Sequence, residues 1–223
     1  MKRLSIIAVA ALIMTGCGNR NQNANNQNTT DMDNTQEYYT FKLSDKVTRR
    51  KVTFRNRYGI TLTGDLYTPK NHGSGTLPAI AVSGPFGAVK EQPSGLYANQ
   101  MAERGFVALA FDPSYTGESG GEPRYVASPD INTEDFSAAV DFLSTLDNVD
   151  PERIGIIGIF GCGGLALNSA VRDTRINATV VSTTYDMRRV NAKGSFDSMD
   201  VAARYVLRET LNAQRTLVAE HGT

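Results

Sequence analysis

The residues of this chain that could do chemistry lie in the stretch GIIGIFGCGGL, residues 155–165, where Cys162 stands among glycines. The β-branched run before Cys162 is typical of a buried strand, and a helix is expected behind it. A nucleophile on a sharp strand-to-helix turn needs tiny neighbours, because its backbone is strained, and Gly161 and Gly163 meet that need. The partial positive charge of the helix N-terminus would favour the thiolate. The alternative interpretation is a small buried residue in a tight turn.

Alternating strands and helices are expected to position this turn. Residues 51–69 alternate apolar and polar side chains around a turn at 57–59, which predicts a half-exposed antiparallel hairpin. Four apolar runs predict strands buried on both faces, at residues 77–84, 106–112, 153–160 and 176–184. Helical spacing occurs between them, at 94–105, 132–149 and 163–173, and again at about 198–220 without a further strand. This order predicts an α/β fold, a parallel sheet with crossover helices on both faces and ligands at the carboxyl ends of its strands.

Three stretches resemble the α/β-hydrolase superfamily, over about residues 50–215. FGCGG, residues 160–164, stands in place of the Gly-x-nucleophile-x-Gly elbow, with Phe160 where the first glycine is expected. SGPFGAVKEQ, residues 83–92, resembles the loop that supplies an oxyanion donor. FDPSYTGESGGEPR, residues 111–124, resembles the family's Asp-x-Arg-Gly-x-Gly-x-Ser loop, of which Asp112, Gly117 and Ser119 match. Together they are most similar to bacterial dienelactone hydrolases and acetyl xylan esterases, a branch in which some members lack the elbow nucleophile.

The resemblance implies a three-layer hydrolase sheet and a set of site residues. Cys162 takes the nucleophile position, as cysteine does in dienelactone hydrolases. The backbone N–H groups of Gly163 and Phe86 would bind the oxyanion, because Pro85 has no N–H to offer. The substrate would be a small ester or lactone, and no organic cofactor is implied. A metal site is not expected, since Cys162 has no Cys or His beside it at ligand spacing.

The resemblance also implies an acid and a histidine after the nucleophile, on loops that follow later strands. Asp186 and His221 occur in that order, and Asp186 follows the strand expected at 176–184. His221 has no predicted strand to hold it, and His72 is expected at the opposite end of the sheet. Because the two final strands of the family have no counterpart, the sequence is interpreted as a hydrolase domain shortened at its C-terminus.

The charge balance excludes one class of partner. Lys and Arg together number 23, and Asp and Glu together also number 23. A chain with no net charge produces no strong field toward a polyanion, so nucleic acid is not an expected partner.

The N-terminus predicts export and a lipid anchor. Residues 1–3 are basic and residues 4–14 are apolar but too short to span a bilayer, which is typical of an export signal. The small residues before Cys17 resemble a bacterial lipoprotein processing site, which implies a signal peptide at 1–16 and a lipid on the sulfur of Cys17. An ordinary secretory signal is the alternative. The Asn- and Gln-rich residues 17–37 predict a flexible tether, which leaves residues 38–223 as the hydrolase domain.

With Cys17 acylated, Cys162 would be the one thiol of an exported domain, so no internal disulfide is expected. Gly18 lacks the acidic signal that is associated with inner-membrane retention, which favours the outer membrane. The first functional hypothesis is therefore a membrane-tethered ester or lactone hydrolase. The second is a catalytically inactive, shortened lipoprotein that keeps the sheet and pocket as a binding surface. A redox-sensing thiol is a third.

Overall fold

A computed structural model describes residues 38–184 and 186–222 of the chain. The signal peptide and tether predicted for residues 1–37 lie outside the described residues. The elements follow in the order β1 (Val47–Arg55), β2 (Thr61–Pro69), β3 (Leu77–Ser83), α1 (Pro93–Glu103), β4 (Val107–Phe111), α2 (Pro129–Ser144), β5 (Val149–Ile159), α3 (Gly161–Arg172), β6 (Ile176–Ser182), α4 (Met187–Lys193), η2 (Ser195–Asp197) and α5 (Val201–His221).

Six strands of the described chain form one sheet in the order β1-β2-β4-β3-β5-β6. β1 and β2 are an antiparallel hairpin, and β2 joins β4 in antiparallel fashion. The pairs β3–β4, β3–β5 and β5–β6 are parallel. One row across the parallel part runs through Ala110, Val82, Ile157 and Val180, so four carboxyl ends meet at one edge. The predicted hairpin and parallel sheet are confirmed.

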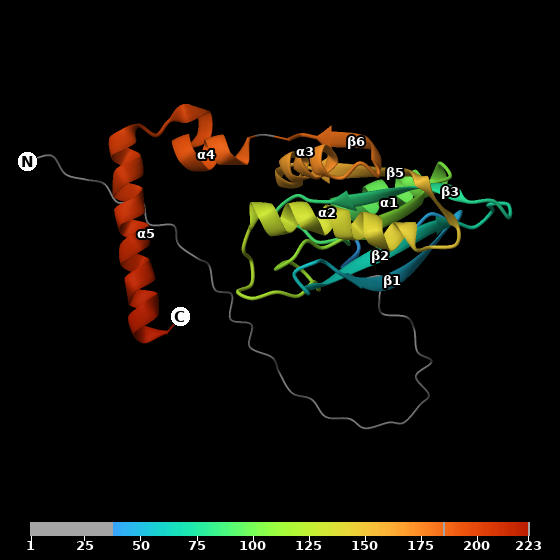
Figure 1. Ribbon diagram of the computed structural model, residues 1–223, viewed down its shortest axis with the longest axis horizontal. Coiled ribbons are helices and arrows are strands. Elements are labelled where there is room, and N and C mark those ends of the chain that lie inside the picture. Colours follow the sequence, from blue (N-terminus) through green and yellow to red (C-terminus); the bar gives the residue numbers. More distant parts are fainter. Residues whose placement is uncertain (1–37, 185, 223) are drawn as a thin grey trace, which may run out of the picture. The chain divides into compact units, whose positions relative to one another are not determined.

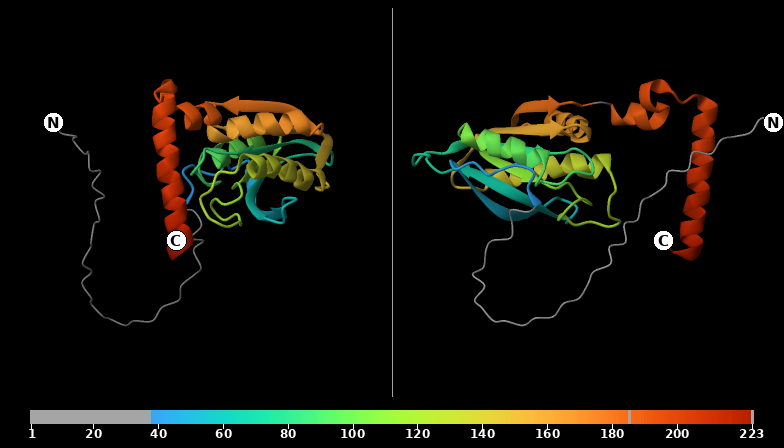
Figure 2. Two further views of the ribbon diagram at one scale, coloured as in Figure 1. Left: turned by 60° about the vertical axis from the view of Figure 1, so that its left-hand side comes forward. Right: turned by 180° about the vertical axis from the view of Figure 1, so that it is seen from behind.

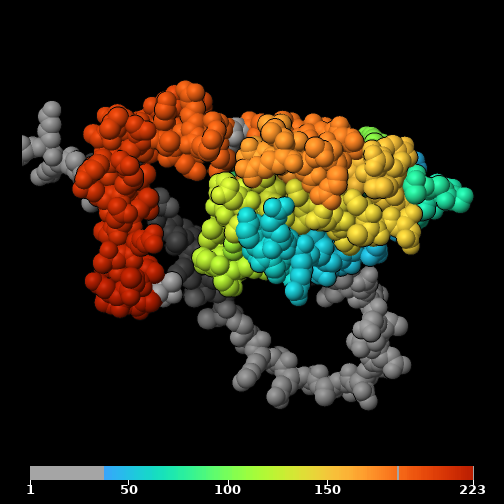
Figure 3. Space-filling view, viewed as in Figure 1, coloured from blue at the N-terminus to red at the C-terminus, as the bar shows by residue number. Residues whose placement is uncertain are grey.

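Helices cover both faces of this sheet (Figures 1 and 2). α2 and α3 pack on one face, where the apolar stripe of α2 that includes Phe136 and Leu143 meets Leu109 and Ile156 of the strands. In the space-filling view the yellow and orange segments, which include these two helices, make up much of the visible surface of the domain (Figure 3). α1 packs on the other face through Ala98 and Ala102. The result is the predicted three-layer α/β arrangement, held together by the burial of apolar surface.

β6 differs from its prediction as a strand buried on both faces. None of its seven residues is buried, and the side chain of Val180 is 52% exposed. The reason is its position: β6 ends the sheet of the described residues, and its outer edge has no strand beside it there. The helix expected near 198–220 is present as α5, which begins at an Asp200 side chain that accepts the N–H of Ala203 at 2.8 Å.

Candidate functional site

The strand-to-helix turn after β5 contains a strained residue, and that residue is Phe160. Its backbone has φ 54° and ψ −116°, a conformation that residues other than glycine rarely adopt, and it immediately precedes α3. Its N–H donates to the carbonyl of Ser182 at 2.9 Å, which ties the turn to the end of β6. A nucleophile elbow is recognised by this kind of strained turn at the edge of the sheet. Phe160 therefore occupies the nucleophile position.

The glycine pattern explains why residue 160 lies at the strained position of the turn. A Cβ at Gly158 would lie 2.5 Å from the carbonyl oxygen of Cys162 and 2.6 Å from Cβ of Ala166, so only glycine lets α3 approach β5. On the other side of the turn, a Cβ at Gly161 would lie 2.2 Å from the Phe86 ring. The small-x-nucleophile-x-small pattern thus runs from Gly158 to Cys162, with Phe160 at its centre.

Cys162 lies in the first turn of α3 and faces the core. It is 1% exposed and belongs to the apolar cluster between the sheet and α2 and α3. Burial raises the pKa of the Cys162 thiol to about 12, against the lowering effect of its hydrogen bond with Ser83. The prediction that Cys162 sits at the strained residue of the turn is wrong by two positions. Two residues along a helix are a rotation of about 200°, which carries this side chain from the mouth of the site to the core.

Both residues expected to donate to an oxyanion lie at the elbow, but the N–H of Gly163 is already engaged. The N–H of Gly163 donates to the carbonyl of Phe160 at 3.0 Å, so it closes the first turn of the helix. Phe86, in the loop after β3, lies at the turn as expected, and its ring packs against Gly161. What this loop presents to the elbow is an aromatic wall.

The expected acid and base have partners of their own. Asp186 caps α4, where its Oδ1 accepts the N–H of Arg189 at 3.0 Å. His221 is on the last turn of α5, exposed, with Nε2 3.9 Å from a Glu220 oxygen. His72 is half-buried in the loop before β3, with Nδ1 3.0 Å from the carbonyl oxygen of Gly73. These contacts do not assemble a Cys162–Asp186–His221 triad.

A cavity of about 410 Å³ opens at this edge of the sheet, in the place where ligands of such folds bind. Its lining is mainly apolar at the elbow and also includes Asp186, the N-cap of α4, and Arg188 of α4. The lining residues are Phe86, Gly161, Gly164, Leu165, Leu167, Thr184, Asp186, Met187 and Arg188. Asp186 is thus on the elbow side of the sheet, as predicted.

Comparison with known proteins places this geometry in a family. The sequence profile described as X-Pro dipeptidyl-peptidase (S15 family) matches residues 58–217. The chain belongs to this family. It is 58% identical to the uncharacterized protein PA2218 of Pseudomonas aeruginosa, over 99% of this chain and 61% of that protein. The crystal structure of PA2218 matches with a TM-score of 0.82 and 66% identity, over 85% of this chain and 59% of that one.

Other solved relatives of this S15-family chain are α/β hydrolases and esterases. The α/β hydrolase GrgF from Penicillium sp. sh18 matches with a TM-score of 0.56 and 28% identity, over 60% of this chain and 45% of that one. An acetyl xylan esterase from Paenibacillus sp. R4 matches with a TM-score of 0.51 and 26% identity, over 60% and 48%. The predicted membership of the α/β-hydrolase superfamily is confirmed. The chain spans about half to three-fifths of the length of these relatives.

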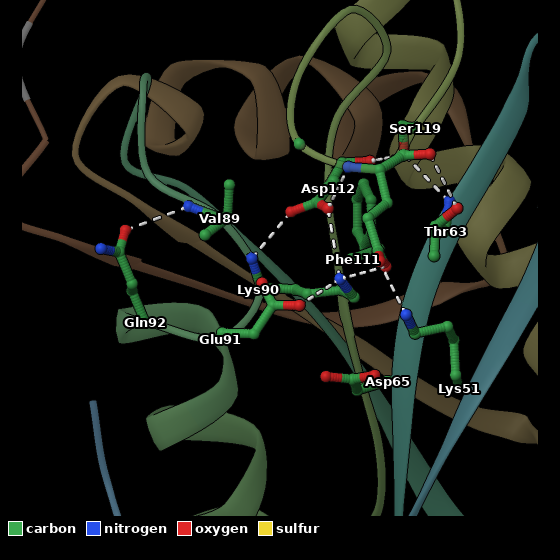
Figure 4. Close-up of polar contacts among 12 residues, drawn as sticks. Lys51, Thr63, Asp65, Val89, Lys90, Glu91, Gln92, Phe111, Asp112 and Ser119 are labelled. Atoms are coloured by element: carbon green, nitrogen blue, oxygen red, sulfur yellow. Dashed lines mark hydrogen bonds and ion pairs between the residues drawn. The ribbon is translucent and has the colours of Figure 1, made fainter. Parts of the chain in front are cut away.

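This S15-family chain also contains a buried ion-pair cluster, to which sequence reasoning gave no special role (Figure 4). Lys90 is fully buried, and its Nζ contacts Glu91, Glu118 at 2.7 Å and Asp112 at 3.6 Å. Burial acts to lower the pKa of Lys90, but the hydrogen bonds with Glu118 and Glu91 outweigh it, so the pKa is raised and the ammonium stays charged. The charged side chains therefore bind the loop after β3 to the loop after β4.

The first described residues of the chain lie against the same cluster. The N–H of Thr40 donates to the carbonyl of Glu91 at 3.1 Å, and the Tyr39 hydroxyl donates to the buried Asp65 at 2.8 Å. Asp65 lies on β2, beside the cluster (Figure 4). The chain thus enters the domain next to the loop that carries Lys90.

The loop after β4 has a second anchor, on α2. The buried carboxylate of Asp135 accepts hydrogen bonds from the N–H and hydroxyl of Ser114, both at 2.8 Å, from the Asn56 side chain at 2.8 Å and from the Asn132 side chain at 3.1 Å. Burial raises the pKa of Asp135, and these four donors oppose that effect. Asp112 and Ser119, which match the family loop, also hold this loop in place. Ser119 donates to the Asp112 carbonyl at 2.6 Å and accepts the N–H of Thr63 at 2.9 Å.

The described part of the chain adds two negative findings. None of its helices combines the length and the apolar composition needed to cross a membrane. Within the same residues, no group of three or more His, Cys, Asp or Glu side chains is arranged to hold a metal ion.

Proposed function

We propose that this S15-family chain is a hydrolase-fold protein that binds a small, largely apolar ligand at its elbow and does not hydrolyse it. One observation carries the proposal: the strained position of the turn holds Phe160. A phenyl ring has no lone pair to attack a carbonyl and no proton to transfer, so the position cannot support nucleophilic catalysis.

The surroundings of Phe160 support binding. The cavity beside it measures about 410 Å³ and is lined at the elbow by Phe86 and Leu165, which suits an apolar group. Cys162 is the nearby thiol, and its burial and its raised pKa keep it protonated at neutral pH. The proposed ligand class is a small ester, lactone or acid with an apolar body.

Ligand binding can be tested by filling the cavity. A Cβ at Gly164 meets no atom within 4 Å, so Gly164→Phe would place a ring in the open space of the cavity. With 8-anilinonaphthalene-1-sulfonate as the probe, we expect binding to weaken at least tenfold in this variant. Val171→Phe is the matched control, because Val171 is on the same helix and 87% exposed. Equal binding by Gly164→Phe and the parent chain would refute the proposed site.

Ester or lactone hydrolysis through Cys162 is the second candidate, favoured by the acetyl xylan esterase among the relatives. In that mechanism the Cys162 sulfur attacks the carbonyl carbon and the alcohol leaves with a proton. Water then cleaves the thioester, which releases the acid and restores the thiol. Phe86, and Gly163 once its N–H had left the Phe160 carbonyl, would donate to the oxyanion, and Asp186 and His221 would act as acid and base. The mechanism requires the sulfur to leave the core and His221 to approach it.

Hydrolysis of p-nitrophenyl acetate by the full chain in detergent separates the two candidates. The proposal expects the rate of the parent chain to equal that of buffer and of Cys162→Ala. Turnover that disappears in both Cys162→Ala and His221→Ala would overturn the proposal and support the second candidate. Turnover that survives Cys162→Ala would contradict both.

We also propose that the protein is an exported lipoprotein held to a bacterial membrane, the outer membrane being favoured, by a lipid on Cys17. The support is the sequence before Cys17. Metabolic labelling of an expressing bacterium with an alkyne fatty acid should mark the protein, and cell fractionation should recover the protein with the membranes. Cys17→Ser should abolish both signals, and a labelled Cys17→Ser protein would contradict the assignment.

A further inference from the structure

We propose that Lys90 is a positioning residue: its buried ammonium clamps residues 84–92 to the neighbouring loop and so holds Phe86 as a wall of the elbow cavity. The inference rests on the cavity of the proposed function. It does not depend on whether a ligand binds or is hydrolysed there, so the two ideas can fail separately.

Lys90 and Phe86 both belong to the loop between β3 and α1. Two backbone hydrogen bonds fold this loop into successive turns, from the N–H of Ala88 to the carbonyl of Pro85 at 3.1 Å and from the N–H of Gln92 to the carbonyl of Val89 at 3.0 Å. Lys90 lies inside the second turn, and Phe86 lies inside the first, against Gly161. A change in the position of Lys90 is therefore passed to Phe86 through the three residues of tightly turned backbone between them.

Lys90 binds the 111–120 loop with both its main chain and its side chain (Figure 4). Its N–H donates to Oδ1 of Asp112 at 2.7 Å, and its Nζ lies 2.7 Å from Oε2 of Glu118. The N–H of Glu118 in turn donates to Oδ2 of Asp112 at 3.0 Å, which closes a ring of contacts between the two loops. One residue thus fixes the separation of the loops.

Burial makes this contact necessary. The side chain of Lys90 and that of Asp112 are both fully buried, so they compensate each other's loss of water. If the ammonium were removed, Asp112 and Glu91 would remain as buried or half-buried carboxylates without their cation. Breaking a buried pair leaves an uncompensated charge, which drives the loops apart or admits water between them.

Lys51 provides a matched control. Its Nζ also lies 2.7 Å from Glu118, on the other carboxylate oxygen, but Lys51 comes from β1 and its side chain is 56% exposed. Replacing Lys51 or Lys90 by methionine removes one positive charge from the same carboxylate. Only the change at Lys90 also removes the contact that belongs to the 84–92 loop.

Cys162 provides a reporter of loop position that is independent of activity. A Cβ at Gly84 would lie 2.9 Å from Cβ of Cys162, so the first residue of the loop covers this side chain. In the full chain with Cys17→Ser, Cys162 is the one remaining thiol. Its rate of reaction with 5,5′-dithiobis(2-nitrobenzoic acid) therefore measures how often the loop opens.

The experiment compares this rate in the parent, Lys90→Met, Lys51→Met and Glu118→Gln chains over a series of urea concentrations below the unfolding transition. We expect Lys90→Met to raise the rate at least tenfold and Glu118→Gln at least threefold, with Lys51→Met within twofold of the parent. The urea dependence of the raised rates should be shallow, because local opening exposes little surface.

Two results would overturn the inference. The first is a Lys90→Met rate equal to that of the parent. The second is a raised rate with the steep urea dependence of global unfolding, which would make Lys90 a residue of general stability only. If Lys90→Met does not fold, Glu118→Gln decides alone, since Glu118 is half-exposed and its loss leaves the core intact; an unchanged rate there refutes the clamp.

Discussion

Replacing Phe160 by glycine and by alanine tests whether the strain of the elbow falls on this residue. Both changes remove the ring, so the loss of its contacts cancels when the two variants are compared. The alanine variant keeps a Cβ at φ 54° and ψ −116°, and strain in such a conformation costs about 1–3 kcal/mol. Glycine removes that strain but gains conformational freedom in the unfolded chain, which costs about 0.5–1 kcal/mol. The glycine variant should therefore be the more stable of the two, by up to about 2.5 kcal/mol.

Urea unfolding followed by far-UV circular dichroism gives the two free energies of unfolding. The control is Val171, an exposed residue of α3 with ordinary helical geometry, where alanine should be more stable than glycine by about 1 kcal/mol. The order of the two variants should thus be opposite at the two positions. The same order at both would show that residue 160 is unstrained, and the assignment of Phe160 to the nucleophile position would be refuted.

Three further predictions concern the packing behind the elbow. Burial raises the pKa of Cys162 from 9.0 to about 12, so the folded state holds this proton at pH values where the unfolded state has lost it. The free energy of unfolding should therefore be constant below pH 9 and fall above it by about 1.4 kcal/mol per pH unit. In urea titrations at pH 8 to 10.5, Cys162→Ala should remove this fall. Gly158→Ala should destabilise the fold by about 2 kcal/mol, because its Cβ overlaps Ala166 in α3, and a melting temperature equal to the parent's would contradict this packing. Asp135→Ala should cost about 3 kcal/mol in chemical unfolding, since it leaves buried donors unsatisfied, whereas Asp135→Asn should cost less.

Much of the fold could be predicted because its signals are local. The apolar runs of β3, β4 and β5 and the stripe of α2 follow from burial alone, and turn residues divide them. β6 has the same composition as a buried strand, but its exposure depends on what lies beside it in space. No run of residues contains that information.

The elbow was found from the sequence, but its register was not. The glycines around Cys162 made that residue the apparent centre of the turn. The constraint that sets the register acts at Gly158, where α3 comes closest to β5, and it becomes visible only when the helix is in place. The pattern of small residues at 158 and 162 was the available signal for Phe160.

Lys90 could not be predicted as a buried residue for a different reason. A lysine in a loop is usually exposed. Its burial requires Glu118 and Asp112, which are 28 and 22 residues away, and the 111–120 loop must first fold around Ser119. Only the folded arrangement of the two loops brings the carboxylates to one point.

The contact of Thr40 with Glu91 sets the place at which a membrane tether would join the domain. The polypeptide enters the fold beside the 84–92 loop, which lines the cavity. A tether attached at Cys17 would therefore join the domain beside that loop. Thr40 is 23 residues after Cys17 (40 − 17 = 23), so the tether between them could reach at most roughly 80 Å when fully extended. The mouth of the cavity would then sample a shell of this depth above the bilayer and meet molecules that leave or enter the lipid surface.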